Sequence, residues 1–133
     1  MDDYIVDIVK GIEMGAWRVK VVVDVGNGIV GRLVVEVYEC FGCDVIFFFC
    51  EMDGNFPNYY FDLIVLENFV DLIVVVKREN ADLGIGFDGD VDWIGVVDEN
   101  GIIIWGDWLL VVFARKLLVV NKGVVVIGDV KCS

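Results

Sequence analysis

LGIGFDGDVDWIGVVDENG, the stretch from Leu83 to Gly101, places an acidic loop between two strand patterns. Leu83–Phe87 is a short apolar run, and two more, Ile94–Val97 and Ile102–Trp105, flank an Asn-Gly pair at positions 100 and 101. Asn-Gly between two apolar runs is a strong β-hairpin signal. The stretch therefore predicts a strand, a loop and an antiparallel hairpin.

The sequence before this stretch alternates strand and helix patterns. Val19–Asp24 is a β-branched run that leads into the glycine turn Gly26–Gly28, and Ile29–Phe41 has helical length. Asp44–Cys50 predicts a second buried strand. Glu51–Leu66 has no clear period and contains glycine, proline and asparagine, so it predicts a long loop of the kind that often carries function.

The other predicted elements complete an α/β pattern. In chain order they are a lead-in helix within residues 1–16, a helix capped by Asn68 or its neighbour and running to about Asn80, a helix from Gly106 to about Val120, and a last strand at Val124–Ile127. Strands alternating with helices, plus one hairpin, predict a three-layer α/β/α domain with a mixed sheet. With 133 residues, we expect one domain over residues 1–133.

Charge and hydropathy limit the partners. The net charge of −12 offers no basic stripe for phosphates, so neither nucleic acid nor an anionic membrane surface is an expected partner, whereas a divalent cation is. Hydrophobic residues make up 58%, but apolar runs such as Val45–Cys50 stay far below the roughly 20 residues that cross a bilayer. The acidic N-terminus lacks a signal-peptide layout. We therefore expect a soluble, cytoplasmic protein.

The four cysteines are Cys40, Cys43, Cys50 and Cys132. Cys40 and Cys43 form a C-x-x-C, the spacing of half a zinc site or of a redox pair. No second C-x-x-C and no histidine completes such a site. We expect reduced, structural cysteines.

The composition has an unusual bias. Threonine, glutamine and histidine are absent, serine and proline occur once each, and valine is the commonest residue. The scarce residues have codons with cytosine at the first or second position, and the abundant apolar residues are what cytosine-to-thymine changes produce from them. We hypothesise that the sequence descends from an ordinary gene by such conversion, the alternative being a design with a restricted alphabet.

The acidic loop is the sharpest candidate site. Asp88, Asp90 and Asp92 alternate directly after an apolar strand, so their carboxylates can converge and hold a cation that offsets their repulsion. Oxygen ligands without histidine or cysteine favour Mg²⁺ or Ca²⁺ over zinc. With Glu99 they also match an EF-hand spacing, but Trp93 stands where that loop needs glycine and the flanks predict strands. A solvated acidic turn is the plain alternative.

The glycine turn supports a rival function. Residues 26–31 fit G-x-G-x-x-G after a strand, and Glu51 lies twenty residues beyond Gly31, which is the layout of a dinucleotide-binding fingerprint. A structural turn into a helix needs the same glycines. A Rossmann-like dinucleotide-binding module therefore remains an alternative.

Four stretches together resemble the phosphohexomutase (phosphomannomutase/phosphoglucomutase) family. They are VVVDVGNGIVG (21–31), GCDV with CEMDGNFPN (42–58), ENADLGIGFDGDVDWIGVVDENG (79–101) and GDVKCS (128–133). They cover nearly the whole chain in the order of that family's second domain. The resemblance implies a four-domain enzyme that moves phosphate between C1 and C6 of a hexose through a phosphoserine, with Mg²⁺ held by Asp88, Asp90 and Asp92.

The departures from the family pattern decide what this chain can do. Trp93 replaces the arginine of the family loop D-G-D-G-D-R, and residues 59–63 read YYFDL where the family has His-His-Pro-Asp-Pro. Each of these is reached by cytosine-to-thymine changes, whereas Val91 for glycine is not and has no explanation. The family's serine, sugar and phosphate loops belong to its other domains, so the chain contains no catalytic residue. We expect a Mg²⁺-binding fragment, inactive alone, that meets a hexose phosphate only with the missing domains. A non-catalytic acidic domain or designed scaffold is the remaining alternative.

Overall fold

The computed structural model describes residues 3–28, 31–51, 65–88 and 92–128. The chain divides into two compact units, Met1–Ile103 and Ile104–Ser133. The single domain predicted for residues 1–133 stays a prediction beside this division. Among the described residues, both hydrophobic core clusters lie in the first unit.

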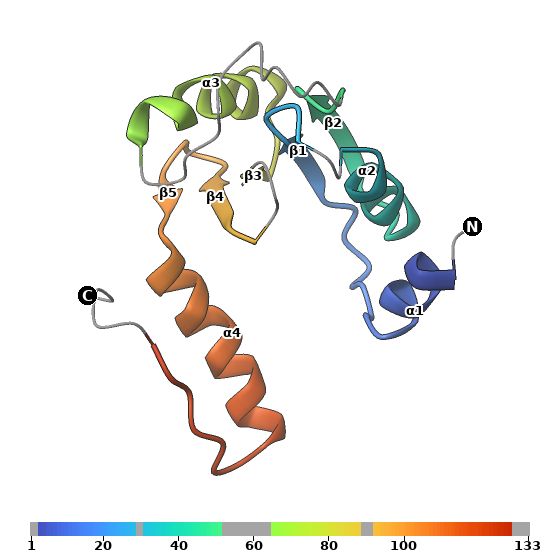
Figure 1. Cartoon of the computed structure of the whole chain (residues 1–133), viewed down its shortest axis with the longest axis vertical. Helices are drawn as coiled ribbons and strands as arrows, with labels where there is room; N and C mark the ends of the chain where they lie inside the picture. The colour runs from blue at the N-terminus through green and yellow to red at the C-terminus, as the bar shows by residue number, and fades with distance from the viewer. Residues whose placement is uncertain (1–2, 29–30, 52–64, 89–91, 129–133) are drawn as a thin grey trace. The chain divides into compact units, whose positions relative to one another are not determined.

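The first unit is built on a mixed sheet (Figure 1). The strands are β1 (Lys20–Asp24), β2 (Asp44–Phe48), β3 (Leu83–Phe87), β4 (Ile94–Asp98) and β5 (Ile103–Ile104), in the order β2-β1-β3-β4-β5. β1 pairs in parallel with both β2 and β3, and β3 pairs antiparallel with β4. The predicted mixed α/β sheet is therefore confirmed.

Helices cover both faces of the sheet because successive side chains of a strand point to opposite sides. Val22 packs with Phe69, Leu72 and Val76 of α3 (Phe69–Glu79). Its neighbours Val21 and Val23 lie in a separate core cluster, against which Val34 and Tyr38 of α2 (Gly31–Cys40) pack. The three-layer α/β/α arrangement follows from this alternation.

Glycine allows α3 to lie close to the sheet. A Cβ atom on Gly84 of β3 would come within 2.6 Å of Val76 Cγ2 and 2.9 Å of Leu72 Cδ1. The same helix ends at Asn80, which adopts the left-handed conformation (φ 50°), and the amide of Ala81 then reaches back to the carbonyl of Val76 at 3.0 Å. This is the hydrogen-bond pattern of a Schellman-type helix end.

The start of α3 differs from the prediction. Asn68 has helical dihedral angles and makes no side-chain capping hydrogen bond, because a 3₁₀ turn, η1 (Leu66–Asn68), leads directly into the helix. At the N-terminus the lead-in helix predicted within residues 1–16 is α1 (Asp3–Lys10). The predicted loop Glu51–Leu66 lies mostly outside the described residues.

The hairpin between β4 and β5 forms at the predicted place with a different turn. The amide of Gly101 donates to the carbonyl of Asp98 at 2.9 Å, and only Gly101 of the Asn-Gly pair has a positive φ. This is a three-residue loop with a left-handed glycine, not the two-residue turn in which both residues have positive φ.

The second unit holds α4 (Gly106–Val120), as predicted. The predicted strand Val124–Ile127 is wrong: these residues have no assigned secondary structure, and Val125 and Ile127 are more than 80% exposed. A β-branched run becomes a strand only when a neighbouring strand pairs with it. Among the described helices, none is long and apolar enough to cross a membrane.

Candidate functional site at the carboxyl ends of β1 and β3

The candidate site lies where the sheet topology changes direction. β2 is on one side of β1 and β3 on the other, and both pair with β1 in parallel, with Asp24 opposite Gly86. The turn after β1 and the loop after β3 therefore follow the carboxyl ends of two adjacent parallel strands, at the same end of the sheet. Ligands of open α/β sheets bind at such a switch point.

The turn after β1 is held by hydrogen bonds that its backbone amides donate. Asp24 is fully buried, and its Oδ1 accepts a hydrogen bond from the amide of Gly26 at 2.9 Å. The amide of Gly28 donates to the carbonyl of Val25 at 2.7 Å. The amide of Asn27 donates to the carbonyl of Phe49 beyond β2, also at 2.7 Å.

Asn27 joins this turn to the chain that follows β2. Its side-chain amide donates to the carbonyl oxygen of Glu51 at 2.6 Å, and its φ is 64°. Asparagine is one of the few residues that adopt this left-handed conformation readily. Sequence reasoning missed the role of Asn27, although an asparagine between two glycines is itself a signal for positive φ.

These contacts bear on the dinucleotide alternative. The amides of Gly26, Asn27 and Gly28 all donate to protein oxygens and so are not directed at a ligand. Gly31, the last glycine of the pattern, is a packing residue, because a Cβ atom there would collide with the carbonyl oxygen of Cys50. In the described residues, the glycine turn is a structural junction between β1 and β2.

The acidic loop is closed at its base by the sheet. Phe87 of β3 pairs with Ile94 of β4, so Asp88–Trp93 connects two antiparallel neighbours. The amide of Trp93 donates to Oδ1 of Asp88 at 3.2 Å across the base of the loop. Strands flank the loop on both sides, which bears out the rejection of an EF-hand, where helices would stand.

The three predicted metal ligands can be followed only in part. Asp88 is half-buried at the end of β3, and Asp92 is exposed two positions before β4. Asp90 lies outside the described residues. Among the residues that are described, no group of three or more His, Cys, Asp or Glu side chains is placed to hold a metal. The loop supplies carboxylate oxygens alone, which is the donor chemistry that Mg²⁺ prefers.

Three of the cysteines, Cys40, Cys43 and Cys50, are free thiols, as predicted, and Cys132 lies outside the described residues. The Cys50 thiol lies 3.4 Å from the carbonyl oxygens of Val23 and Phe48. Burial raises the pKa of Cys50 and also that of Cys43, so both are protonated near neutral pH. Protonated thiols are poor nucleophiles and metal ligands.

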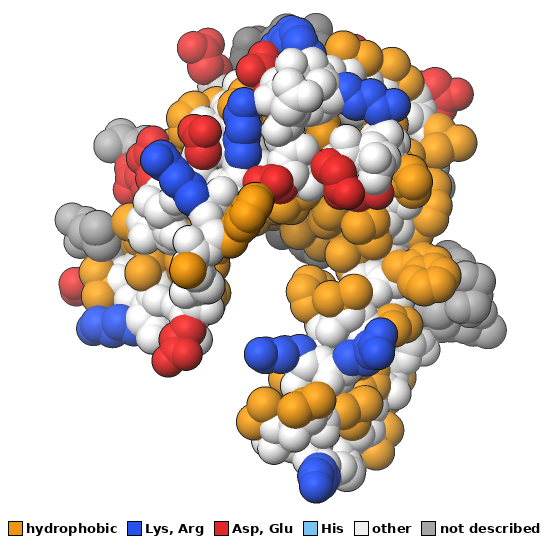
Figure 2. Space-filling view, turned by 180° about the vertical axis from the view of Figure 1, so that it is seen from behind, with side chains coloured by type: hydrophobic (Ala, Val, Ile, Leu, Met, Phe, Trp, Pro, Cys, Tyr) orange, Lys and Arg blue, Asp and Glu red, His pale blue; other side chains and the backbone are white. Residues whose placement is uncertain are grey.

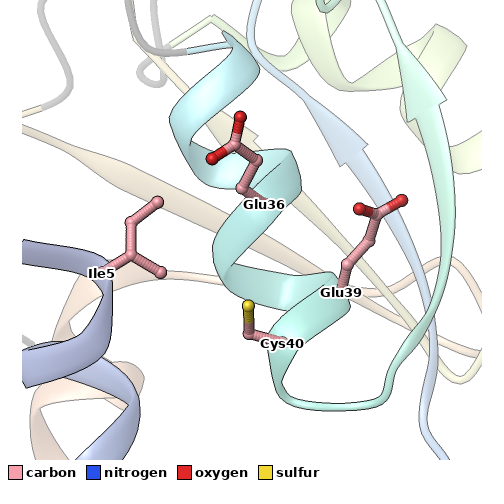
Figure 3. Close-up of a pocket in the computed structure, with 4 residues that line it drawn as sticks. All are labelled: Ile5, Glu36, Glu39 and Cys40. Atoms are coloured by element: carbon pink, nitrogen blue, oxygen red, sulfur yellow. The ribbon is translucent and has the colours of Figure 1, made fainter. Parts of the chain in front are cut away.

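Two further pockets lie away from the acidic loop. One, of about 410 Å³, is lined by Ile5, Glu36, Glu39 and Cys40, and Figure 3 shows Ile5 of α1 facing the side of α2 that carries Glu36 and Cys40. The other, of about 510 Å³, lies near the start of β3, between the end of α3 and the β4–β5 hairpin. Neither pocket includes the glycine turn or Asp88.

The chain is similar to known proteins over most of its length. Residues 2–101 match the family described as phosphoglucomutase/phosphomannomutase, alpha/beta/alpha domain II. The phosphomannomutase/phosphoglucomutase of Pseudomonas aeruginosa is 52% identical over 114 residues, which are 86% of this chain and 25% of that protein. Its counterpart in Pseudomonas putida is 47% identical over 133 residues, or 100% of this chain and 28% of that protein.

A solved structure has the same fold. The crystal structure of a phosphoglucomutase/phosphomannomutase family protein from Burkholderia thailandensis matches with a TM-score of 0.88 at 40% identity. The match covers 92% of this chain and 26% of that one. The chain thus spans about a quarter of the length of the relatives it resembles.

Proposed function

The chain belongs to the phosphoglucomutase/phosphomannomutase family and contains its α/β/α domain II, and from this premise we propose that it provides the Mg²⁺-binding loop of a phosphohexomutase. The proposed ligands are Asp88, Asp90 and Asp92. In the intact enzyme, this loop would serve phosphoryl transfer between positions of a hexose phosphate.

One observation carries the proposal: the Phe87–Ile94 pair and the Trp93–Asp88 hydrogen bond close the loop at its base. Paired ends allow alternate side chains of a six-residue loop to come together. Three carboxylates brought together in this way would repel one another unless a cation lay among them. The hydrogen bond occupies one acceptor position of the Asp88 carboxylate, which has about four.

The roles of this chain's residues follow from their positions. The Trp93 amide orients the Asp88 carboxylate, and the rigid β3 strand fixes the point from which it projects. A bound divalent ion would offset the negative charge on the phosphoryl group during transfer, which is the main catalytic requirement of this chemistry. The three carboxylates would hold the ion at the carboxyl ends of β1 and β3, where the rest of the enzyme would present the substrate.

The proposal includes inactivity of the isolated chain. Trp93 is 57% exposed, and its indole cannot replace the two parallel hydrogen bonds that an arginine donates to phosphate. Hexose phosphate is proposed as a partner only together with the parts of the relatives that this sequence does not span. A cytoplasmic location, without nucleic-acid or membrane partners, belongs to the same proposal.

Fluorescence titration tests the proposed ligand class. Mg²⁺ is expected to change the emission of Trp93, which adjoins the loop, and NAD is expected to leave it unchanged. Because Trp17, Trp105 and Trp108 also emit, the Trp93→Phe variant supplies the background signal. A response to NAD without one to Mg²⁺ would favour the dinucleotide-binding alternative.

An activity assay tests the rest of the proposal. The chain alone is expected to show no turnover of glucose 1-phosphate at any Mg²⁺ concentration. Turnover above a blank without protein would contradict the assignment of the chain as a fragment.

A further inference from the structure

One carboxylate of the first unit is enclosed by the fold. On the face shown in Figure 2, Asp and Glu side chains (red) lie scattered over the surface. Asp24 differs from them, because it is the only carboxylate among the described residues that is fully buried. It is the last residue of β1 and lies between Phe48 of β2 and Gly86 of β3. Asp24 is thus enclosed by strands of the first unit.

The turn that follows Asp24 does not itself require a charge. Oδ1 of Asp24 accepts a hydrogen bond from the amide of Gly26, two residues further along, at 2.9 Å. An asparagine side chain forms the same kind of turn and is uncharged. Burying a charged carboxylate costs far more free energy than burying an amide, unless a positive charge lies nearby. The turn alone therefore does not account for a carboxylate at position 24.

Strand alternation sets the side of the sheet that Asp24 faces. Val22, two residues earlier, packs in the core cluster that contains α3. Gly84, the register partner of Val22 on β3, lies against the same helix. Asp24 and its partner Gly86 each follow by two positions, so they lie on the α3 side of the sheet.

The same alternation extends to the acidic loop. Asp88 follows Gly86 by two positions, directly after the last residue pair of β3 and β4, so its side chain starts on the side that Asp24 faces. With strands about 4.8 Å apart and a rise of about 3.3 Å per residue, the Cα atoms of Asp24 and Asp88 lie about 8 Å apart. The residue between them on β3 is Gly86, which has no side chain to separate the two carboxylates.

We propose that the buried Asp24 carboxylate supports the metal site of the acidic loop: from behind Asp88, its negative charge strengthens Mg²⁺ binding without coordinating the ion. The inference rests on the proposed function, since it takes Asp88, Asp90 and Asp92 as the ligands. A divalent ion and a charge about 8 Å away attract each other appreciably when the charge is buried, because salt screens buried charges little. The ion also offsets the repulsion between Asp24 and Asp88.

A matched pair of variants isolates the charge of Asp24. Asp24→Asn removes the charge and keeps an oxygen that can accept the hydrogen bond of the turn. Asp82→Asn is the control, because Asp82 also accepts a hydrogen bond from a backbone amide, that of Lys20, at 2.7 Å. Asp82 lies just before β3, roughly 20 Å from Asp88 along the strand, which is beyond the screening distance at physiological salt.

Calorimetric titration of both variants with Mg²⁺ is the first measurement. Asp24→Asn is expected to bind Mg²⁺ at least about threefold more weakly than the wild-type chain, whereas Asp82→Asn is expected to bind it with unchanged affinity. Equal Mg²⁺ affinities of the two variants would overturn the proposal.

Carboxyl carbon-13 NMR of the wild-type chain is the second measurement, which applies even where Asp24→Asn fails to fold. The Asp24 carboxyl signal is expected to move on addition of Mg²⁺ with the same midpoint as that of Asp88, while the Asp82 signal stays in place. An unmoved Asp24 signal beside a moving Asp88 signal would overturn this inference and leave the metal-binding loop standing. If the Asp88 signal itself did not respond, the proposed function would fail, and this inference with it.

Discussion

The side-chain amide of Asn27 donates a hydrogen bond to the carbonyl oxygen of Glu51 at 2.6 Å, which ties the turn after β1 to the chain leaving β2. Asn27 has a φ of 64°. Replacing it with alanine is expected to cost about 2 kcal/mol, because the variant loses the hydrogen bond and strains the backbone. Asn27→Gly is expected to cost about half as much, since glycine adopts this φ freely.

Urea unfolding of the two Asn27 variants measures this difference. The order wild type, then glycine, then alanine is the predicted order of stability. If alanine were at least as stable as glycine, the left-handed conformation of residue 27 would not matter to the fold.

A second prediction concerns the close contact of α3 with β3. Gly84→Ala places a methyl group 2.6 Å from Val76 Cγ2, so it is expected to destabilise the chain by about 1–3 kcal/mol. Gly15→Ala is the matched control, because nothing lies within 4 Å of its added Cβ. Thermal unfolding of both variants gives the comparison, and an equal effect would show that α3 does not approach the sheet at Gly84.

Acidification tests the hairpin turn. The amide of Ile102 donates to Oδ1 of Asp98 at 2.7 Å, and with those of Asn100 and Gly101 it holds the pKa of Asp98 below its usual value. Because the folded pKa is lowered, the stabilisation is present above the unfolded pKa and is lost as the pH falls through the folded one. The stability difference between wild type and Asp98→Asn is therefore expected to be largest at neutral pH and to shrink below about pH 4.

Stability curves from pH 7 to pH 2 provide the measurement. A difference that stays constant, or that grows on acidification, would mean that the charged form of Asp98 does not stabilise the turn.

The encoding DNA tests the origin of the composition. Conversion of cytosine to thymine is expected to leave cytosine scarce at silent third codon positions as well as at coding ones. Plentiful cytosine at silent positions would contradict the hypothesis. The exposed Val70 and Val74 on α3 show that the valine excess reaches surface positions where burial does not require an apolar residue.

Local patterns predict the first unit well where pattern and packing agree. The apolar run Leu83–Phe87 coincides with its strand, because it lies at the centre of the sheet and every second residue meets a helix layer. Val124–Ile127 is an equally apolar run, yet it is not a strand, and no described strand pairs with it. Strand propensity is therefore realised only through pairing.

The site was predictable in its chemistry and less so in its geometry. The alternation of Asp88, Asp90 and Asp92 identified an oxygen-rich loop, and the structure adds the Trp93–Asp88 hydrogen bond at its base. The internal hydrogen bonds of the glycine turn could not be foreseen, because the partners Phe49 and Glu51 are distant in sequence from Asn27. A dinucleotide-binding turn and a structural turn share the same glycine pattern. They are told apart by whether the turn amides face a ligand or, as here, donate to protein oxygens.

Calorimetric titration of Mg²⁺ tests the central claim most directly. The wild-type chain is compared with Asp88→Asn and with Asp7→Asn, which removes the same charge from an exposed position of α1. The account predicts that Asp88→Asn weakens Mg²⁺ binding at least about tenfold, or about 1.4 kcal/mol, while Asp7→Asn leaves it unchanged. Equal Mg²⁺ affinity in all three proteins would contradict the assignment of the acidic loop as the metal site.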